Sequence, residues 1–156
     1  MSVSTNSCLI HFTIGGSAIK GESKTTGYAD WFDGDADLDL RAYRNGRTLD
    51  YGYASVSIPT TKASWDIYGK IMKQSYGLVD IKVALLNSDA NAANYSAIVR
   101  EFTDCEILSI THSVDGFGFL FKVRGSVGLS AEIPTAEGKT EKLGPSVYDL
   151  ITNQPK

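Results

Sequence analysis

The stretch Ala18-Ile-Lys-Gly-Glu-Ser-Lys24, followed by the turn residues 25–30 and Trp31, joins an apolar run to an Asp-rich run. Before it, residues 8–14 divide by a period of two into an apolar face and a mixed face, which predicts a half-buried strand. Glycines within and before the stretch predict a change of direction. The simplest interpretation is a turn-rich link between two strands, and the rest of the chain decides what domain these strands begin.

The remainder of the chain consists mostly of predicted strands. Thr103-Asp104 interrupts two of them and predicts a bulge, and Asp115-Gly116 predicts a hairpin turn. Residues 127–133 continue the pattern more weakly. The predicted strands are residues 37–43, 54–59, 79–85, 95–102, 105–113 and 117–123.

One long helix is predicted over residues 62–75, with an N-cap at Thr60-Thr61 or at Ser64 and a stop at Gly77. Its apolar stripe is a packing face formed by Trp65, Tyr68, Ile71 and Met72. Beyond the strands, residues 134–144 predict a loop and residues 145–151 one or two helical turns. These elements predict a mainly β domain, a two-sheet β-barrel or sandwich with one flanking α-helix.

Composition limits the function classes. The chain has 156 residues and a net charge of −3, so a basic face that would wrap a phosphate backbone is not expected. The N-terminus has neither the basic nor the apolar region of a signal peptide, and no apolar run is long enough to span a bilayer. We therefore expect synthesis in the cytosol. Cys8 and Cys105 are expected to be free thiols, although a disulfide between them stays open.

A search for catalytic and metal-binding patterns finds no strong candidate. Asp33, Asp35 and Asp37 suggest a calcium loop, but an EF-hand needs Gly and Glu where Leu38 and Arg44 stand. His11 and His112 lack partners at metal-ligand spacing. Nucleophile, Walker and dinucleotide motifs are absent. The sequence thus predicts no enzyme activity, cofactor or metal, although a pair of carboxylates brought together by folding stays open.

Ile19-Lys-Gly-Glu-Ser23 resembles the IKGES-type signature near the start of Hcp proteins, the tube-forming subunits of type VI secretion systems. Later elements follow in the matching order: the strand 55–59, the helix start Thr60-Thr-Lys-Ala-Ser64, and the strand pair 80–86 and 95–102. The chain is similar to this family over about residues 8–127. We therefore divide it into an Hcp-like tube domain, residues 1–127, and a C-terminal extension, residues 128–156, packed on or between subunits.

The resemblance implies a structural role. Hcp-like subunits form hexameric rings that stack into a hollow inner tube inside a contractile sheath, and the tube delivers effectors. The implied partners are further copies of the chain, the sheath, baseplate or spike proteins, and an effector held in the lumen without specific binding. The implied location is the bacterial cytoplasm before assembly, followed by secretion through injection. Phage tail tube proteins, which conduct DNA and reside in the virion tail, are the alternative.

The resemblance also implies two groups of functional residues. The family signature consists of Ile19, Lys20, Gly21, Glu22 and Ser23. Residues 44–53 are the loop expected to reach the neighbouring ring, because Arg and Tyr side chains are enriched at interfaces. Its predicted contact residues are Arg44, Arg47, Leu49, Tyr51 and Tyr53.

Two other function classes compete with the tube subunit. A small-ligand-binding β-barrel would use Trp31, Phe119 and Phe121 to line its cavity. A hydrolase would need paired Asp or Glu side chains, for which no pattern in the sequence speaks.

Overall fold

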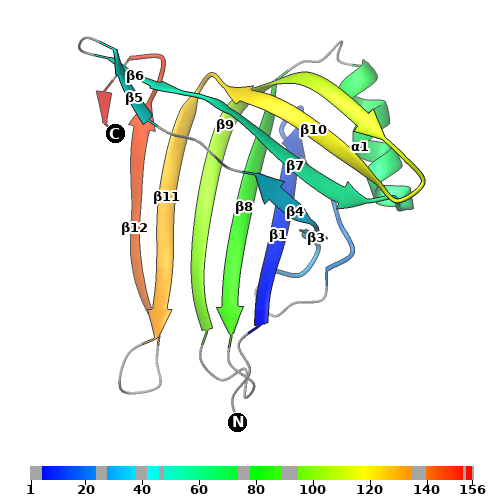
Figure 1. Ribbon diagram of the computed structural model, residues 1–156, viewed down its shortest axis with the longest axis horizontal. Helices are drawn as coiled ribbons and strands as arrows, with labels where there is room; N and C mark the ends of the chain where they lie inside the picture. The colour runs from blue at the N-terminus through cyan, green and yellow to red at the C-terminus, as the bar shows by residue number, and fades with distance from the viewer. Residues whose placement is uncertain are drawn as a thin grey trace.

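A computed structural model describes residues 5–23, 28–37, 42–45, 48–73, 78–88, 95–134, 140–152 and 154–155. Strands dominate the described chain, and α1 is its one helix (Figure 1). In chain order the elements are β1 (Thr5–Ile14), β2 (Ser17–Ala18), β3 (Phe32–Asp33), β4 (Asp35–Asp37), β5 (Ala42–Asn45), β6 (Thr48–Tyr51), β7 (Tyr53–Pro59), α1 (Lys62–Lys73), β8 (Val79–Ser88), β9 (Tyr95–His112), β10 (Gly116–Val123), β11 (Ser126–Pro134), β12 (Thr140–Asp149) and β13 (Gln154–Pro155).

One antiparallel sheet bends into two layers. The first half of β9 pairs with β8 on one side and β11 on the other, and β1 and β12 extend this first layer. The second half of β9 pairs with β10, and β7 and β4 continue this second layer. The second layer crosses in front of β1 and β8 (Figure 1). The predicted mainly β class with one helix is confirmed, and the two layers are parts of one open sheet.

The bend lies where β9, and the turn that joins β10 to β11, cross from one layer to the other. Arg124 N and Gly125 N donate hydrogen bonds to the carbonyl oxygens of Asp104 (3.1 Å) and Thr103 (3.0 Å). Asp104 has a positive φ of 51°, and its N–H donates to Asp80 Oδ1 at 2.9 Å. This confirms the bulge predicted at residues 103–104, since two residues of β9 stand opposite one residue of β8.

The core lies between the two layers. Phe117, Phe119 and Phe121 alternate along β10 and are fully or almost fully buried, as their spacing predicts. Phe119 meets Phe12 of β1 edge to face at 5.5 Å between ring centroids. Strand β10 therefore supplies the centre of the core.

A smaller cluster covers the other face of β1 and β8. Tyr28 packs there on Leu9, Ala84 and Leu86, and Trp31 lies against the same cluster. Near Leu9 and Ala84 both faces of these two strands are therefore covered, which explains why the buried set on β8 changes from alternation to the consecutive pair Val83-Ala84.

Helix α1 begins at the predicted cap. Ser64 N donates to Thr61 Oγ1 at 3.2 Å, and Thr61 N donates to Ser64 Oγ at 2.7 Å, so the two hydroxyls cap each other's backbone. The predicted stop at Gly77 lies outside the described residues. No helix of the described chain is long and apolar enough to cross a membrane.

The predicted packing stripe of α1 is partly wrong. Ile67 and Ile71 are fully buried, whereas Trp65 is 57% and Met72 45% exposed. Tyr68 is half-buried and packs against the core, with its ring 5.7 Å from that of Phe117. The sequence pattern therefore identifies Tyr68 and Ile71 correctly and misses Ile67.

The C-terminal prediction is wrong where the structure describes it. Residues 140–149 form β12, although residues 140–144 were expected in a loop and 145–151 in helical turns. Gly144 and Pro145 stand together opposite Ser130, and Gly144 has φ +86°. A bulge accommodates both residues, because proline lacks the N–H that a regular ladder needs. The predicted domain division at residue 127 falls inside β11.

The segment predicted as a loop over residues 44–53 contains a hairpin. Asn45 of β5 pairs with Thr48 of β6, and the strands continue to the pair Ala42 and Tyr51. Residues 46–47 lie outside the described chain. The strand predicted over residues 37–43 is described only at its ends, in β4 and β5.

Candidate assembly surface

The segment Ile19–Ser23 forms a strand-like junction that pairs with residues 30–31. Gly21 N donates to Asp30 O at 2.6 Å, and Ser23 N donates to Trp31 O at 2.8 Å. Ile19 and Ser23 are buried, whereas Glu22 is exposed. The junction therefore holds its alternate residues in the domain and directs Glu22 outward.

Gly21 is required at its place by close packing. A Cβ there would lie 2.5 Å from Trp31 O and 2.9 Å from the Phe32 ring. We expect Gly21→Ala to lower the free energy of unfolding by roughly 1–3 kcal/mol. Urea unfolding at fixed protein concentration measures the change.

Gly69 provides the matched control for this substitution. It lies in α1, and a Cβ added there would have no heavy atom within 4 Å outside the helix's own adjacent backbone. Gly69→Ala should raise the free energy of unfolding by about 0.5–1 kcal/mol, because alanine favours helix. Equal effects of the two substitutions would show that close packing at Gly21 does not matter.

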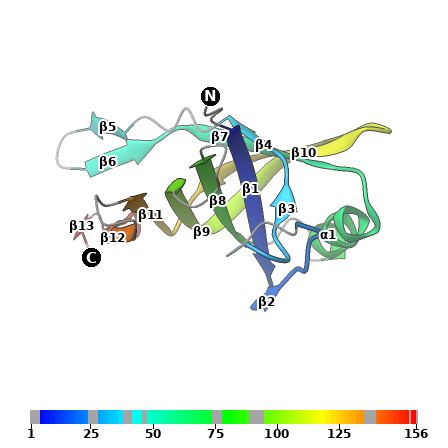
Figure 2. The same ribbon diagram turned by 90° about the horizontal axis from the view of Figure 1, so that it is seen from below.

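The residues predicted to join stacked rings lie on or beside the β5–β6 hairpin. Arg44 and Leu49 stand opposite each other in the register, and Tyr51 lies at the end of β6. Tyr53 begins β7, is 58% exposed and has Lys122 Nζ 5.4 Å from its ring centroid. Arg47 lies outside the described residues. The hairpin forms its own two-stranded sheet, apart from the main one (Figure 2).

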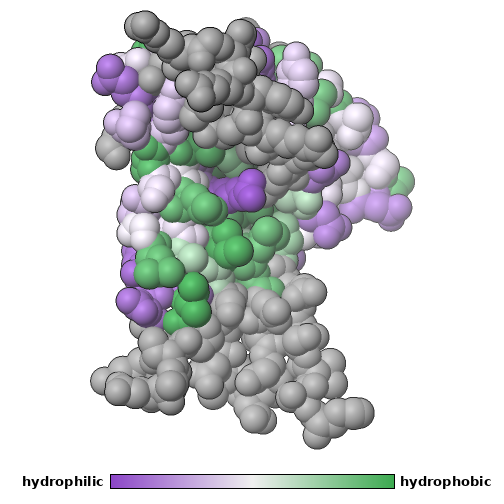
Figure 3. Space-filling model, turned by 60° about the vertical axis from the view of Figure 1, so that its left-hand side comes forward, coloured by the Kyte–Doolittle hydropathy of each residue, from purple (hydrophilic) through white to green (hydrophobic). Residues whose placement is uncertain are grey.

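The first layer carries a broad apolar face that the second layer does not cover. Leu85, Ile98, Ala131 and Leu143 stand opposite one another across four strands. Figure 3 shows apolar side chains gathered over this half of the sheet. We call this surface the open face; its large side chains, each 41–46% exposed, are Leu85, Ile98, Leu129, Ile133 and Leu143.

The open face exists because the second layer covers only part of this surface of the first layer. On β8, Val83 is fully buried, but Leu85, two residues further along the same side, is exposed. On β9, Phe102 is buried, and Ile98 on the same side is exposed. The main core thus continues into a solvent-facing apolar surface along the same strands.

One cation lies within the open face. Arg100 of β9 stands opposite Val83 and Leu129 in the register. Its Nε is buried and makes no hydrogen bond with any described residue. Beside it is a shallow hollow of about 320 Å³, lined by Arg100, Val127, Gly128, Leu129, Ser146, Val147, Tyr148 and Pro155.

Solved structures similar to this chain identify its fold. Over 95% of its length the chain superposes on 99% of a type six secretion system protein, at TM-score 0.64 and 16% identity. Hcp1 from Salmonella typhimurium matches with TM-score 0.54 and 16% identity over 96% of this chain and 99% of that one. The chain has the Hcp fold. Secreted Hcp3 from Pseudomonas aeruginosa matches with TM-score 0.58 and 10% identity over 88% and 97%.

The likeness is one of structure, and it extends beyond the expected region. No family model and no curated protein matches the sequence. The resemblance predicted from Ile19–Ser23 is confirmed at the level of fold. The first structure covers 95% of the chain, so the Hcp-like part includes most of residues 128–156.

Metal and thiol chemistry adds no second site in the described chain. Asp33, Asp35 and Asp37 are exposed on β3 and β4, and no group of three potential metal ligands occurs among the described residues. Cys8 and Cys105 are free. Burial, with a smaller contribution from Asp35, raises the pKa of the Cys8 thiol to about 11. Burial likewise raises the pKa of Cys105.

The two histidines pack as strand residues. His11 lies 5.2 Å from the Trp31 ring, and burial, followed by the nearby Lys82 charge, lowers its pKa. His112 is exposed beside Tyr68. The imidazoles lie on different strands and in different aromatic clusters.

The side chains predicted to line a ligand cavity do not meet. Phe119 and Phe121 are buried in the core between the layers. Trp31 packs on the smaller cluster, on the other side of β1 and β8. A barrel cavity built from these three residues is therefore wrong.

Sequence reasoning missed the open face and Arg100. The available signal is the alternation of Val127, Leu129, Ala131 and Ile133, which by itself predicts only a weak continuation of a strand. A period of two identifies which side chains share a face of a sheet. Whether another layer covers that face depends on contacts distant in sequence.

Proposed function

We propose that this chain is the structural subunit of a hollow tube, in which hexameric rings stack to form the inner tube of a type VI secretion-like injection machine. The Hcp fold over nearly the whole chain supports this role. The signature-like segment at Ile19–Ser23 favours the secretion machine over a phage tail. The subunit acts by assembly rather than by catalysis.

The observation that carries the proposal is the open face. Five large aliphatic side chains lie together on one regular sheet surface, in direct continuation of the core. Contiguous apolar surfaces of this kind mark interaction sites in proteins that are otherwise soluble. A second copy of the chain would remove this face from water.

The C-terminal strands fit the same role. Leu129 and Ile133 of β11 and Leu143 of β12 supply much of the open face. This supports the prediction that residues 128–156 pack on or between subunits. Sheath and baseplate or spike proteins would surround the finished tube, and an effector would travel in its lumen. The subunit would be made in the bacterial cytoplasm and leave the cell by injection.

The mass of the purified protein tests the proposal. A hexamer should have a mass of about 100 kDa, six times the 16.9 kDa of one chain. Light scattering after size exclusion gives the mass, and negative-stain microscopy should show rings with a central hole. A protein that stays monomeric at high concentration would contradict the proposed function.

A further inference from the structure

Arg100 lacks a counter-charge within the described chain. Its side chain is partly buried, it stands between Val83 of the core and Leu129 of the open face in the register, and its Nε has no hydrogen-bond acceptor in the described chain. A guanidinium is a strong donor that ordinarily binds a carboxylate or another acceptor when removed from water. If a second copy covers the open face, it must bring an acceptor to this position.

Glu22 has complementary properties. The hydrogen bonds of Gly21 and Ser23 fix the backbone on both sides of it, so the direction of its side chain is restricted. Lys20, the neighbouring exposed cation, lies 3.9 Å from Asp30. Glu22 itself is exposed and forms no ion pair with any residue that the structure describes. It is a rigidly presented carboxylate without a partner in the described part of its own subunit.

The positions of the two residues suit a ring. In a cyclic assembly each copy uses two different surfaces, one for each neighbour. Figure 2 shows β2, which precedes the segment with Glu22, at the lower margin beyond β1, whereas β11 and β12 of the open face lie at the left, on the far side of β8 and β9. The contact can therefore repeat from copy to copy.

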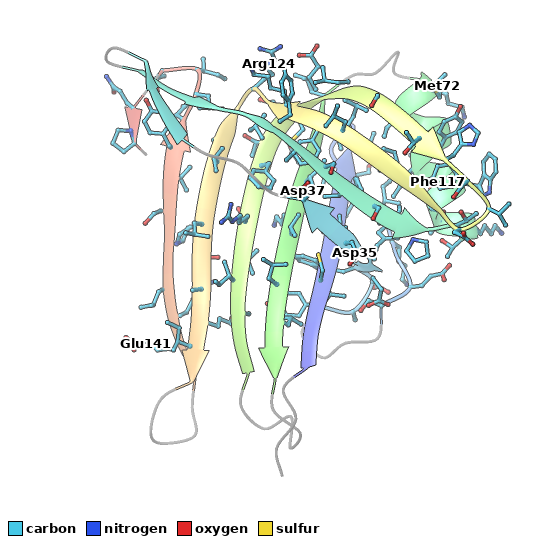
Figure 4. The ribbon with its side chains drawn as sticks, in the orientation of Figure 1. Asp35, Asp37, Met72, Phe117, Arg124 and Glu141 are labelled. Carbon is cyan, nitrogen blue, oxygen red and sulfur yellow. The ribbon has the colours of Figure 1, made fainter. Side chains whose placement is uncertain are left out.

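The acidic strand is a poorer counterpart for Arg100. Asp35 and Asp37 lie on β4, in front of β1 and β8, on the same side of the sheet as the open face (Figure 4). Asp35 is also close enough to raise the pKa of Cys8, which stands in the cross-strand row of Leu85 and Ile98. A ring contact joins two different surfaces of the subunit, so β4, on the same side as Arg100, is less suited than the segment of Glu22 to face Arg100 of a neighbour.

We propose that Arg100 of one copy binds Glu22 of the next copy, so that the signature segment docks on the open face of its neighbour. This inference rests on the proposed ring-forming function and names its contact. A bidentate pair between guanidinium and carboxylate would fix the register of neighbouring subunits, while the aliphatic side chains around it exclude water.

Charge reversal tests this pairing. Arg100→Glu and Glu22→Arg should each weaken ring formation by roughly 30-fold or more, because each places like charges in the contact. The double variant restores opposite charges and should recover most of the association measured by analytical ultracentrifugation. Circular dichroism checks that each variant is folded, and Arg100→Gln replaces the reversal if Arg100→Glu does not fold.

Matched controls come from ion pairs inside one subunit. Arg124 binds Glu106 at 2.7 Å, and Asp66 lies 3.5 Å from Lys70. Arg124→Glu and Asp66→Lys should change association by less than about fivefold.

The outcomes separate this inference from the proposed function. If the native protein forms no ring, the proposed function fails first. If the native protein forms rings that neither single reversal weakens, the pairing of Arg100 with Glu22 is wrong. The pairing is also wrong if the double variant associates no better than the single variant with the weaker association. In both cases the proposed ring remains.

Discussion

Replacing Ile98 and Leu129 together with aspartate is expected to convert the assembled protein into a folded monomer. Ile98 of β9 and Leu129 of β11 are diagonal neighbours on the open face and are 44% and 46% exposed. In the subunit alone, both carboxylates would reach water. Arg100 stands opposite Leu129 and could pair with only one of the two carboxylates. In an assembly that covers the face, at least one carboxylate per interface would therefore be buried without a counter-charge, which costs several kcal/mol.

Light scattering after size exclusion measures this effect. The variant should elute as a species near the 16.9 kDa of one chain at concentrations where the native protein forms rings. Leu120→Asp is the strand-matched control, because Leu120 is 38% exposed on the outer side of the second layer. Rings that persist in the double variant would exclude the open face from the subunit contact.

Local patterns predicted the centre of the fold. The alternation of Phe117, Phe119 and Phe121 identifies a strand with one buried face, because successive side chains of a strand point to opposite faces. The cap at Thr61 follows from hydroxyl chemistry at a helix start, which is also local. The order of strands and helix, together with Ile19–Ser23, predicted the resemblance to Hcp proteins, and the fold agrees with it.

Long-range pairing explains what the sequence could not predict. Residues 140–149 are polar and contain Gly144 and Pro145, so local preferences favour a loop or turn. Pairing with β11 makes the segment a strand, and a bulge removes the conflict at Gly144-Pro145. Tertiary pairing thus overrides propensity in the strand that holds Leu143 of the open face.

The candidate site was hidden for a related reason. Val83 and Leu85 are equivalent in sequence pattern, yet one is fully buried and the other belongs to the open face. The difference arises because β9 leaves the first layer at Thr103-Asp104, so the second layer covers the part of β8 near this bend, which holds Val83, and not the part further along, which holds Leu85. The sequence pattern shows which side chains share a face of a strand. It does not show how far another layer covers that face.

The signature segment has a double role in the proposed assembly. Gly21 and Ser23 shape the junction within the subunit, as their backbone hydrogen bonds indicate. The carboxylate of Glu22 is exposed at this junction. Its direction away from the subunit is what makes it available for Arg100 of a neighbour.

The second large effect is expected at the β5–β6 hairpin, where Leu49→Asp with Tyr51→Asp should leave rings intact and prevent their stacking. The hairpin is a separate two-stranded sheet, and within the described chain its strands pair only with each other (Figure 1). An isolated two-stranded sheet is marginal in water. A neighbouring ring that packs on it would stabilise it, and two carboxylates in that contact would be desolvated without partners.

Negative-stain microscopy distinguishes the two levels of assembly. The variant should give single rings where the native protein gives tubes, with circular dichroism unchanged. Val114→Asp is the control, because Val114 is 93% exposed at the β9–β10 turn, away from the hairpin. Long tubes from the Leu49 and Tyr51 variant would show that the hairpin does not join rings, and loss of the rings themselves would assign it to the contact within a ring. Since the open face is expected to act within a ring and the hairpin between rings, only the two variants together separate lateral from axial assembly.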